Sequence, residues 1–333
     1  MRRFLLVIFV VSCGLTAIEA QAWEVLNTSL KAEKRGRDIL LSFMDESKSV
    51  IIRSDTLFWD EASGYIFFRN KQLTGIIDPW ELEIVQEPAY ISIETIGTDY
   101  YLVQGEDGFF LAIREFPLEP VSDKYEVVDK LLARGDGSWL ETDPLLISRK
   151  GKYGLLLLGN GGVEMALKPE VDEINGEKIG EKDYVYFFRK GDKWGAGRCE
   201  GVEIEAKYDQ IAMLGGNCGE TAYIVWKNDK CGIAKAQEED PVIPVVYENI
   251  TYLEKNNLHY LFLFENDIPV KMAVSDNAAE WYEFYIPEFL IRDQLRGKSF
   301  LVYRDNGDLV SLALTEEDIR ETGILTMDII HLD

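Results

Sequence analysis

Histidine is nearly absent from this sequence, whose 333 residues include only His259 and His331. A Ser-His or Cys-His catalytic pair, or a histidine-containing zinc site, would have to use one of them. The G-x-S-x-G, H-E-x-x-H and P-loop motifs are also missing. We therefore interpret both histidines as structural. We expect a non-enzymatic protein with no catalytic, cofactor-binding or metal-binding residues.

Cysteine is scarce as well, with four residues in the chain. Cys199, Cys218 and Cys231 lie close together in sequence, and their spacing fits no zinc motif. In an oxidising compartment, three cysteines allow one disulfide and leave one thiol over. The spacing does not decide which two would pair.

Long apolar runs are missing except at the start, and residues 4–11 fall short of the roughly twenty residues that span a bilayer. Arg2 and Arg3 precede this run, and Ala20-Gln21-Ala22 follows it with a small-x-small pattern. This layout predicts a signal peptide over residues 1–22 and an exported protein, either periplasmic, secreted or at the cell surface. The alternative is lipidation at Cys13, because residues 10–13 resemble a lipobox.

Basic residues are few relative to acidic ones, with 35 Lys and Arg against 59 Asp and Glu. The formal net charge is −24, and it becomes −25 once Arg2, Arg3 and Glu19 leave with the signal peptide. Such an excess repels nucleic acids and anionic membrane surfaces, so neither is an expected partner. A hydrophobic fraction of 47% excludes a disordered chain.

The sequence contains one recurring motif, which we call the repeat phrase. It reads as a strand, a polar turn, an aromatic-Gly pair that opens a second strand, a further turn, and a third strand that closes on Tyr-acid-x-Ile. The clearest copies are residues 184–211 and 223–250, and weaker ones are 65–93, 100–128 and 146–174. The centres of successive copies lie 35, 44, 41 and 37 residues apart, at Gly75, Phe110, Gly154, Gly195 and Gly232.

The clearest copy, with Lys193-Trp194-Gly195 followed by Tyr208-Asp209-Gln210-Ile211, resembles the WG repeat of bacterial proteins. The resemblance covers residues 65–275, with Tyr153 or Cys231 replacing the Trp and Phe110 replacing the Gly in other copies. It implies a repetitive all-β architecture. It implies no active site, because WG-repeat proteins share no catalytic residues.

The glycine, tryptophan and tyrosine positions of this repeat also have a direct physical interpretation. Gly after an aromatic residue in a strand marks a bulge or a close backbone approach, which we expect at Gly195. We expect Trp194 to bury its ring against the adjoining unit. The closing tyrosines occupy one fixed place per repeat, which indicates a shared core position for Tyr90, Tyr125, Tyr208 and Tyr247.

The ends of the chain depart from the phrase. Residues 23–64 predict an N-terminal hairpin around Asp45-Glu46-Ser47, or a degenerate first repeat. Residues 276–333 predict a capping region with two short helices. The first spans residues 277–297, with Asn277 as N-cap and Pro287 as a break. The second spans residues 315–323, with Asp318 in the capping-box position.

Three further patterns resemble a nucleotide-binding, a calcium-binding and an adhesion motif, but each has a simpler interpretation. The glycine-rich segment after Leu155 lacks the third glycine of a dinucleotide loop, so we interpret it as a hairpin. The acidic runs 238–240 and 305–308 lack calcium-loop spacing and are interpreted as solvated turns. Arg134-Gly135-Asp136 spells an adhesion tripeptide, but a match this short arises readily by chance.

The sequence thus predicts an all-β repeat protein with units of about forty residues. A propeller-like ring is favoured over an open β-solenoid, because closure removes exposed sheet edges. The predicted function is an exported, non-catalytic binding or scaffold module that presents loops to a protein or glycan partner in the cell envelope. The alternative is an envelope hydrolase with a carboxylate pair in a central channel.

Overall fold

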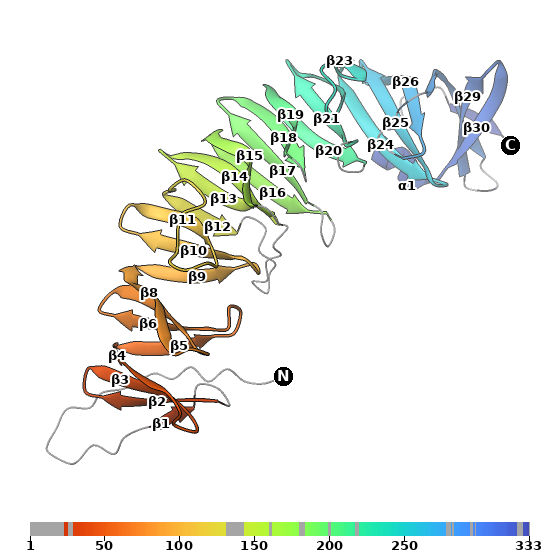
Figure 1. Ribbon diagram of the computed structural model, residues 1–333. Helices are drawn as coiled ribbons and strands as arrows, with labels where there is room; N and C mark the ends of the chain where they lie inside the picture. The colour runs from red at the N-terminus through yellow and green to blue at the C-terminus, as the bar shows by residue number, and fades with distance from the viewer. Residues whose placement is uncertain are drawn as a thin grey trace, which may run out of the picture. The chain divides into compact units, whose positions relative to one another are not determined.

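The computed structural model describes residues 23–25, 29–130, 143–159, 162–179, 184–198, 201–216, 220–277, 281, 283–293, 296, 298–324 and 329–332. The predicted signal peptide with Cys13, the tripeptide 134–136, Cys199 and Cys218 lie outside these residues. The described chain holds thirty-one strands and one helix, which confirms the all-β class (Figure 1). No helix within it is long and apolar enough to cross a membrane.

The chain divides into two compact units, one ending at Pro120 and the other beginning at Val121. The first unit has three antiparallel sheets: β1 (Trp23–Val25), β2 (Leu30–Arg35), β3 (Asp38–Phe43) and β4 (Ser49–Arg53); β5 (Thr56–Asp60), β6 (Tyr65–Asn70), β7 (Leu73–Asp78) and β8 (Glu83–Tyr90); and β9 (Ser92–Ile96), β10 (Tyr100–Gly105) and β11 (Gly108–Ile113).

The second unit has five sheets of four strands each. They are β12 (Val127–Lys130), β13 (Leu145–Arg149), β14 (Lys152–Gly159) and β15 (Gly162–Val171); β16 (Glu173–Lys178), β17 (Tyr184–Lys190), β18 (Lys193–Arg198) and β19 (Gly201–Tyr208); β20 (Gln210–Gly215), β21 (Ala222–Lys227), β22 (Lys230–Lys235) and β23 (Ile243–Tyr247); β24 (Asn249–Lys255), β25 (Leu258–Glu265), β26 (Ile268–Ser275) and β27 (Glu283–Tyr285); and β28 (Pro287–Asp293), β29 (Lys298–Asp305), β30 (Asp308–Leu314) and β31 (Ile329–Leu332).

The repeating phrase corresponds to the last three strands of a sheet and the step to the next one. In the clearest copy these strands are β17, β18 and β19, paired in chain order. The closing Tyr-acid-x-Ile segment is the junction between one sheet and the next, because β19 ends at Tyr208 and β20 begins at Gln210. The structural unit is therefore a four-stranded meander whose first strand begins at the previous copy's close.

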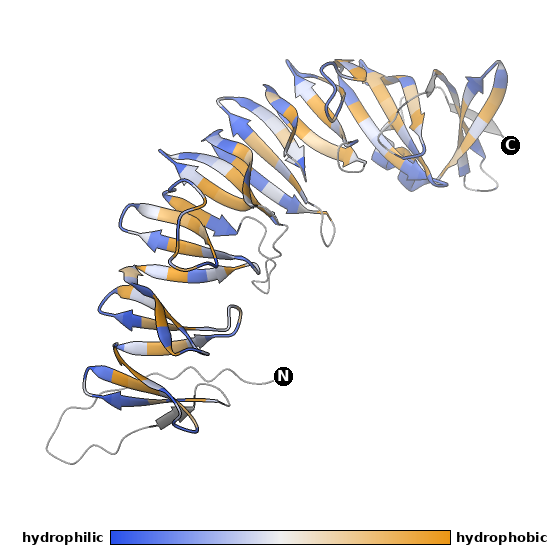
Figure 2. Cartoon of the chain, viewed as in Figure 1, coloured by the Kyte–Doolittle hydropathy of each residue, from blue (hydrophilic) through white to orange (hydrophobic). Residues whose placement is uncertain are grey.

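The core lies between consecutive sheets of a unit, which explains strands that are apolar on both faces. Along β17, Tyr184, Tyr186 and Phe188 pack with Leu155 of the preceding sheet. Val185 points the other way and packs with Tyr223 and Val225 of the next sheet. Figure 2 shows apolar residues along the strands and polar residues at the turns.

The glycine of the phrase sits where the backbone is crowded, as the sequence predicts. A Cβ built on Gly195 would lie 2.6 Å from the Ile204 carbonyl oxygen, and the β18–β19 register shifts between Trp194 and Ala196, the two residues that flank it. Cβ atoms on Gly154 and Gly232 would meet backbone oxygens at 2.5 Å. The glycine thus allows the fourth strand to bulge across the third.

The sheet of β9, β10 and β11 shows what happens without this glycine. Phe110 occupies the position, and β11 gains no full fourth strand, only an isolated bridge from Ala112 to Pro120. The segment that follows contains Pro117 and Pro120, which have no backbone N–H to donate to a ladder.

The C-terminal region differs from the expectation of two helices. The helix predicted over residues 277–297 is wrong, because this segment holds β27 and β28. Its aromatic and β-branched residues favour strand, and Pro287 is the first residue of β28, where a missing N–H is tolerated. The local capping pattern at Asn277 was therefore misleading.

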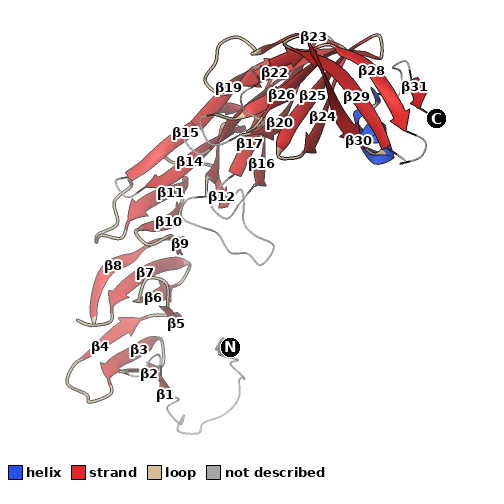
Figure 3. Ribbon diagram, turned by 90° about the vertical axis from the view of Figure 1, so that its right-hand side faces the viewer, coloured by secondary structure: helices blue, strands red, loops and turns tan. Residues whose placement is uncertain are grey.

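The second predicted helix is confirmed as α1 (Glu316–Thr322), visible in blue in Figure 3. Thr315 and Asp318 form a capping box, and Gly323 ends the helix in a left-handed conformation. Ile319 packs in the core with residues of β24 and β25. Lys255 binds Asp318, and Thr251 donates to the Thr322 carbonyl oxygen at 2.8 Å, so the helix is fixed on β24.

Candidate interaction site

The acidic residue of the repeat phrase joins two consecutive sheets. At Asp209 one carboxylate oxygen accepts from the Asn228 N–H at 2.7 Å, and the other binds Lys193 Nζ. The Asp209 backbone N–H donates to the Trp226 carbonyl oxygen at 2.8 Å. Since Lys193 precedes the junction and Asn228 lies in the hairpin turn after it, one side chain links both sheets. We call this arrangement the junction clamp.

The junction clamp recurs along the second unit. Asp172 binds Lys152 and accepts from the Gly191 N–H at 2.8 Å. Glu248 binds Lys230 at 3.2 Å and accepts from the Asn266 N–H at 2.5 Å. In each case the lysine opens the Lys-x-Gly triplet in the third strand of the preceding sheet. The paired positions of lysine and acid in the phrase are therefore structural.

The junction clamps predict a loss of stability in acid. Hydrogen bonds from Lys193 and the Asn228 backbone hold the pKa of Asp209 below its usual 3.8, and contacts to Lys152 and Lys230 likewise lower the pKa of Asp172 and Glu248. The folded state then holds fewer protons than the unfolded state near these values. This contribution is present above about pH 4.5 and is lost as the pH falls through the lowered folded values.

We expect Asp209→Asn to lower the melting temperature at neutral pH by about 1 to 4 °C and to flatten its fall in acid. Melts recorded from neutral pH to about pH 3 test this. The matched control is Asp192→Asn, whose carboxylate lies 3.7 Å from the same Lys193 but is 87% exposed. Equal melting curves for the two variants would contradict the junction clamp.

Trp194 does not bury its ring as expected. The side chain is only partly buried at the start of β18, and the Arg189 guanidinium lies 6.0 Å from its ring centre. Trp194 is the second residue of β18, next to the turn that joins β17 and β18. Three of the four closing tyrosines are buried as predicted, namely Tyr125, Tyr208 and Tyr247, whereas Tyr90 is only partly buried and packs against the edge of the core.

The other residues that the sequence singled out make contacts within the fold. His259 Nδ1 lies 2.6 Å from the Tyr252 hydroxyl, between adjacent strands, and β14 and β15 form a hairpin around the glycine-rich segment. Cys231 is a buried free thiol whose pKa burial raises to about 11. Across the described residues, no group of three or more His, Cys, Asp or Glu could hold a metal.

The turn between β7 and β8 carries an exposed aromatic side chain. Trp80 lies in this turn and is 63% exposed, although a large aromatic ring usually gains by burial. Asp78 Oδ1 accepts from the Trp80 N–H at 2.7 Å and from the Glu81 N–H at 3.1 Å. Leu82 anchors the turn in the core. The ring is therefore held outward by a well-bonded turn.

Trp80 is the outer end of a continuous row of aromatic rings across two sheets. Its ring meets Tyr65 edge-on at 5.8 Å, and Tyr65 meets Phe116 at 5.0 Å. Phe116 continues to the fully buried Tyr101 at 6.2 Å. The row then runs through Phe67 to Phe58, which is exposed again. We call these six residues the aromatic row: Trp80, Tyr65, Phe116, Tyr101, Phe67 and Phe58.

Arg114 fixes the turns around the aromatic row. Its guanidinium donates to the Thr98 carbonyl oxygen at 2.5 Å and to the Ser63 carbonyl oxygen at 2.6 Å, and lies 5.8 Å from the Tyr101 ring centre. Asp60 adds a second tie, accepting from the Thr95 hydroxyl at 2.6 Å. Since Ser63 and Asp60 belong to the turn before Tyr65, these contacts position the ring that supports Trp80.

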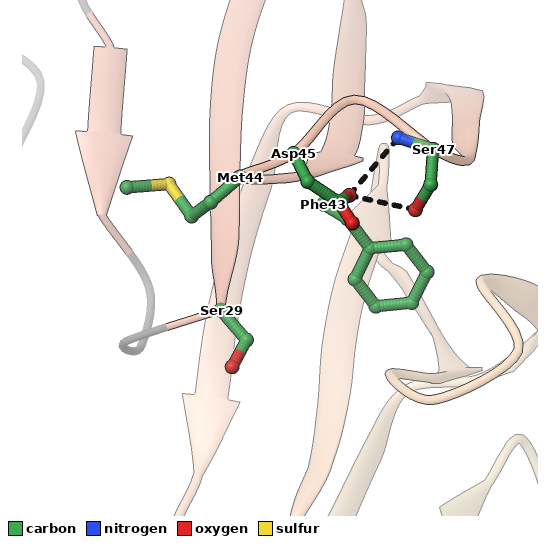
Figure 4. A pocket seen from close by; sticks show the side chains of 5 residues that line it. All are labelled: Ser29, Phe43, Met44, Asp45 and Ser47. Carbon is green, nitrogen blue, oxygen red and sulfur yellow. Dashed lines mark hydrogen bonds between the residues drawn. The ribbon is translucent and has the colours of Figure 1, made fainter.

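A cavity of about 440 Å³ lies beside the β3–β4 turn, lined by Ser29, Phe43, Met44, Asp45 and Ser47 (Figure 4). Asp45 accepts from both the N–H and the hydroxyl of Ser47, at 3.0 and 2.6 Å, which lowers its pKa. This confirms the predicted turn. The carboxylate is committed to its own turn, so the cavity offers less for recognition than Trp80 does.

Sequence reasoning missed Trp80. The available signal was its setting, Asp78-Pro79-Trp80-Glu81, because a tryptophan seldom occupies a turn built from Asp and Pro. The repeat alignment drew attention to Trp194, at the aromatic-Gly position, and away from the turns.

Comparison with known proteins adds little. No family model matches the chain, and no curated protein matches it. Among solved structures, Hsv2p of Kluyveromyces lactis is 10% identical with a TM-score of 0.27, covering 88% of this chain and 96% of that chain. A eukaryotic initiation factor is 11% identical with a TM-score of 0.30, covering 86% and 85%. At these values neither likeness supports a conclusion about function.

Proposed function

We propose that this chain is an exported, non-catalytic binding or scaffold module that presents its turns to a protein or glycan partner in the cell envelope. The observation that carries the proposal is Trp80, an exposed ring on a well-bonded turn, supported by the aromatic row. Tryptophan is enriched among the residues that dominate binding energy at protein interfaces. Arg114 and Asp60 tie the neighbouring turns together and supply the fixed support that such a turn requires.

A general acid in a glycosidase needs a raised pKa. Within the described residues, seven carboxyl groups instead have a pKa lowered by lysine, arginine, hydroxyl, amide or backbone contacts, so these seven are not candidates for the general acid of the hydrolase alternative. They are Asp45, Glu46, Asp172, Glu173, Asp209, Glu248 and Asp318.

Export and ring closure form part of the proposal. Export rests on the pattern of residues 1–22, with lipidation at Cys13 as the alternative route. The propeller-like ring is retained over the open β-solenoid because closure removes exposed sheet edges. Small-angle scattering on the mature protein distinguishes them, since a rod-like maximum dimension would exclude the ring.

Affinity capture from envelope extracts tests the function. The mature chain from Trp23, immobilised, should retain a protein or polysaccharide reproducibly, and failure to retain either would contradict the proposal. Screening the same protein against glycan and peptidoglycan libraries tests the hydrolase alternative. Turnover that disappears on substitution of one Asp or Glu would replace binding with catalysis.

A further inference from the structure

We propose that the Trp80 end of the aromatic row is a docking site for a cationic polypeptide segment, with a Lys or Arg side chain of the partner lying over the exposed Trp80 ring. The inference rests on the proposed function and names the partner class for it. Both the aromatic geometry and the charge around Trp80 support it.

The Trp80 ring is accessible to a ligand on a face. The rings of Trp80 and Tyr65 are perpendicular, with an angle of 89° between their planes, so Tyr65 can approach at most one of the two Trp80 faces, and Trp80 stays 63% exposed. A cation over a tryptophan face is attracted by the negative charge of the π system, and tryptophan is the strongest of the aromatic side chains in this respect. The bonded turn also lowers the entropy lost on binding, because Trp80 is already held in place.

The charges next to Trp80 are mainly negative. Glu81 and Glu83 have side chains 69% and 70% exposed, and the turn that carries the supporting Tyr65 adds Asp60 and Glu61. Two cations that contact these turns are engaged within the chain. Lys48 Nζ lies 3.4 Å from Glu81, and Arg114 donates to two backbone carbonyl oxygens. Carboxylates therefore remain in excess for a partner's cations.

Charge favours a basic polypeptide over a neutral glycan as the occupant. A sugar ring could stack on Trp80, but it would gain no ionic attraction from Glu81, Glu83 and Glu61. The net charge of −24 also steers cationic partners toward the protein and increases their rate of association. Successive Lys or Arg side chains could engage the ring and the flanking carboxylates together.

Isothermal titration of the mature chain with octalysine tests the proposal, with octaserine and a neutral chitin oligosaccharide as comparison probes. Trp80→Ala should weaken octalysine binding roughly three- to thirty-fold, and Trp80→Phe should retain most of the affinity because it keeps an aromatic face. The matched control is Trp194→Ala, which removes a partly exposed tryptophan from the second unit and should leave the affinity unchanged.

A second pair of variants separates the local site from general attraction to an acidic protein. Glu81→Gln with Glu83→Gln should weaken octalysine binding and reduce its salt dependence. Glu238→Gln with Glu239→Gln removes the same charge from an exposed turn of the second unit and should have little effect. Thermal melts of all variants confirm that each is folded.

Equal octalysine affinity in the Trp80→Ala and Trp194→Ala variants would overturn the proposal. Trp80-dependent binding of the chitin oligosaccharide without octalysine binding would also overturn it, and would leave the proposed binding function intact with a glycan as partner. The proposed function fails by a different result, the failure to retain any partner from envelope extracts.

Discussion

Replacing Gly195 by alanine should lower the free energy of unfolding by about 2 to 4 kcal/mol. The added Cβ would lie 2.6 Å from the Ile204 carbonyl oxygen and 2.9 Å from the Ala206 backbone nitrogen. Both are backbone atoms, so no rotamer change relieves the overlap. The strand β19 would have to move away, and its cross-strand packing would be lost. Urea denaturation with circular dichroism measures the change.

Gly105→Ala is the matched control for this experiment. Gly105 ends β10, and a Cβ there would have its nearest neighbour at 3.8 Å, an ordinary contact. We expect a change of less than about 1 kcal/mol. If both variants lost the same stability, the bulge at the repeat glycine would not be what requires a residue without a side chain.

Replacing Phe67 by alanine should cost about 3 to 5 kcal/mol, because the ring is fully buried and its removal leaves a cavity. Phe67 stacks on Phe58 at 5.3 Å and meets Tyr101 at 6.0 Å. Its loss should also loosen the support of Trp80, so partner retention should fall as well. Thermal melting and the capture assay measure the two effects.

Phe58→Ala provides the comparison within the same pair of rings. Phe58 is 44% exposed, so we expect a cost of about 1 kcal/mol and unchanged partner retention. Phe67→Leu keeps most of the buried volume and should fold if the alanine variant does not. Wild-type partner retention in a destabilised but folded Phe67 variant would show that the aromatic row does not support Trp80.

The repeat could be predicted because its physical requirements recur at fixed places in the chain. Gly75, Gly154, Gly195 and Gly232 each precede a register shift or sit within one, so the crowded third strand leaves a direct mark on the sequence. The closing tyrosines mark the core in the same way. The ionic link between the Lys-x-Gly triplet and the closing acid remained hidden, because it joins residues of different sheets.

The misjudged elements share a physical cause, since local patterns competed with tertiary packing. The cap-like Asn277 suggested a helix where aromatic and β-branched residues pair as β27 and β28. Trp194 looked like a core residue, yet its position beside a turn leaves it partly exposed. Trp80 belongs to no repeat position, and only the arrangement of its turn shows that the ring is held in solvent.

The most direct test of the account is the Trp80→Ala variant, measured both by thermal melting and by retention of the partner captured from envelope extracts. An exposed recognition residue predicts a melting temperature within about 1 °C of wild type and a loss of partner affinity of at least roughly tenfold. Trp194→Ala should retain the partner. A clear fall in melting temperature with unchanged partner retention would contradict the account, since Trp80 would then act in the fold and not in binding.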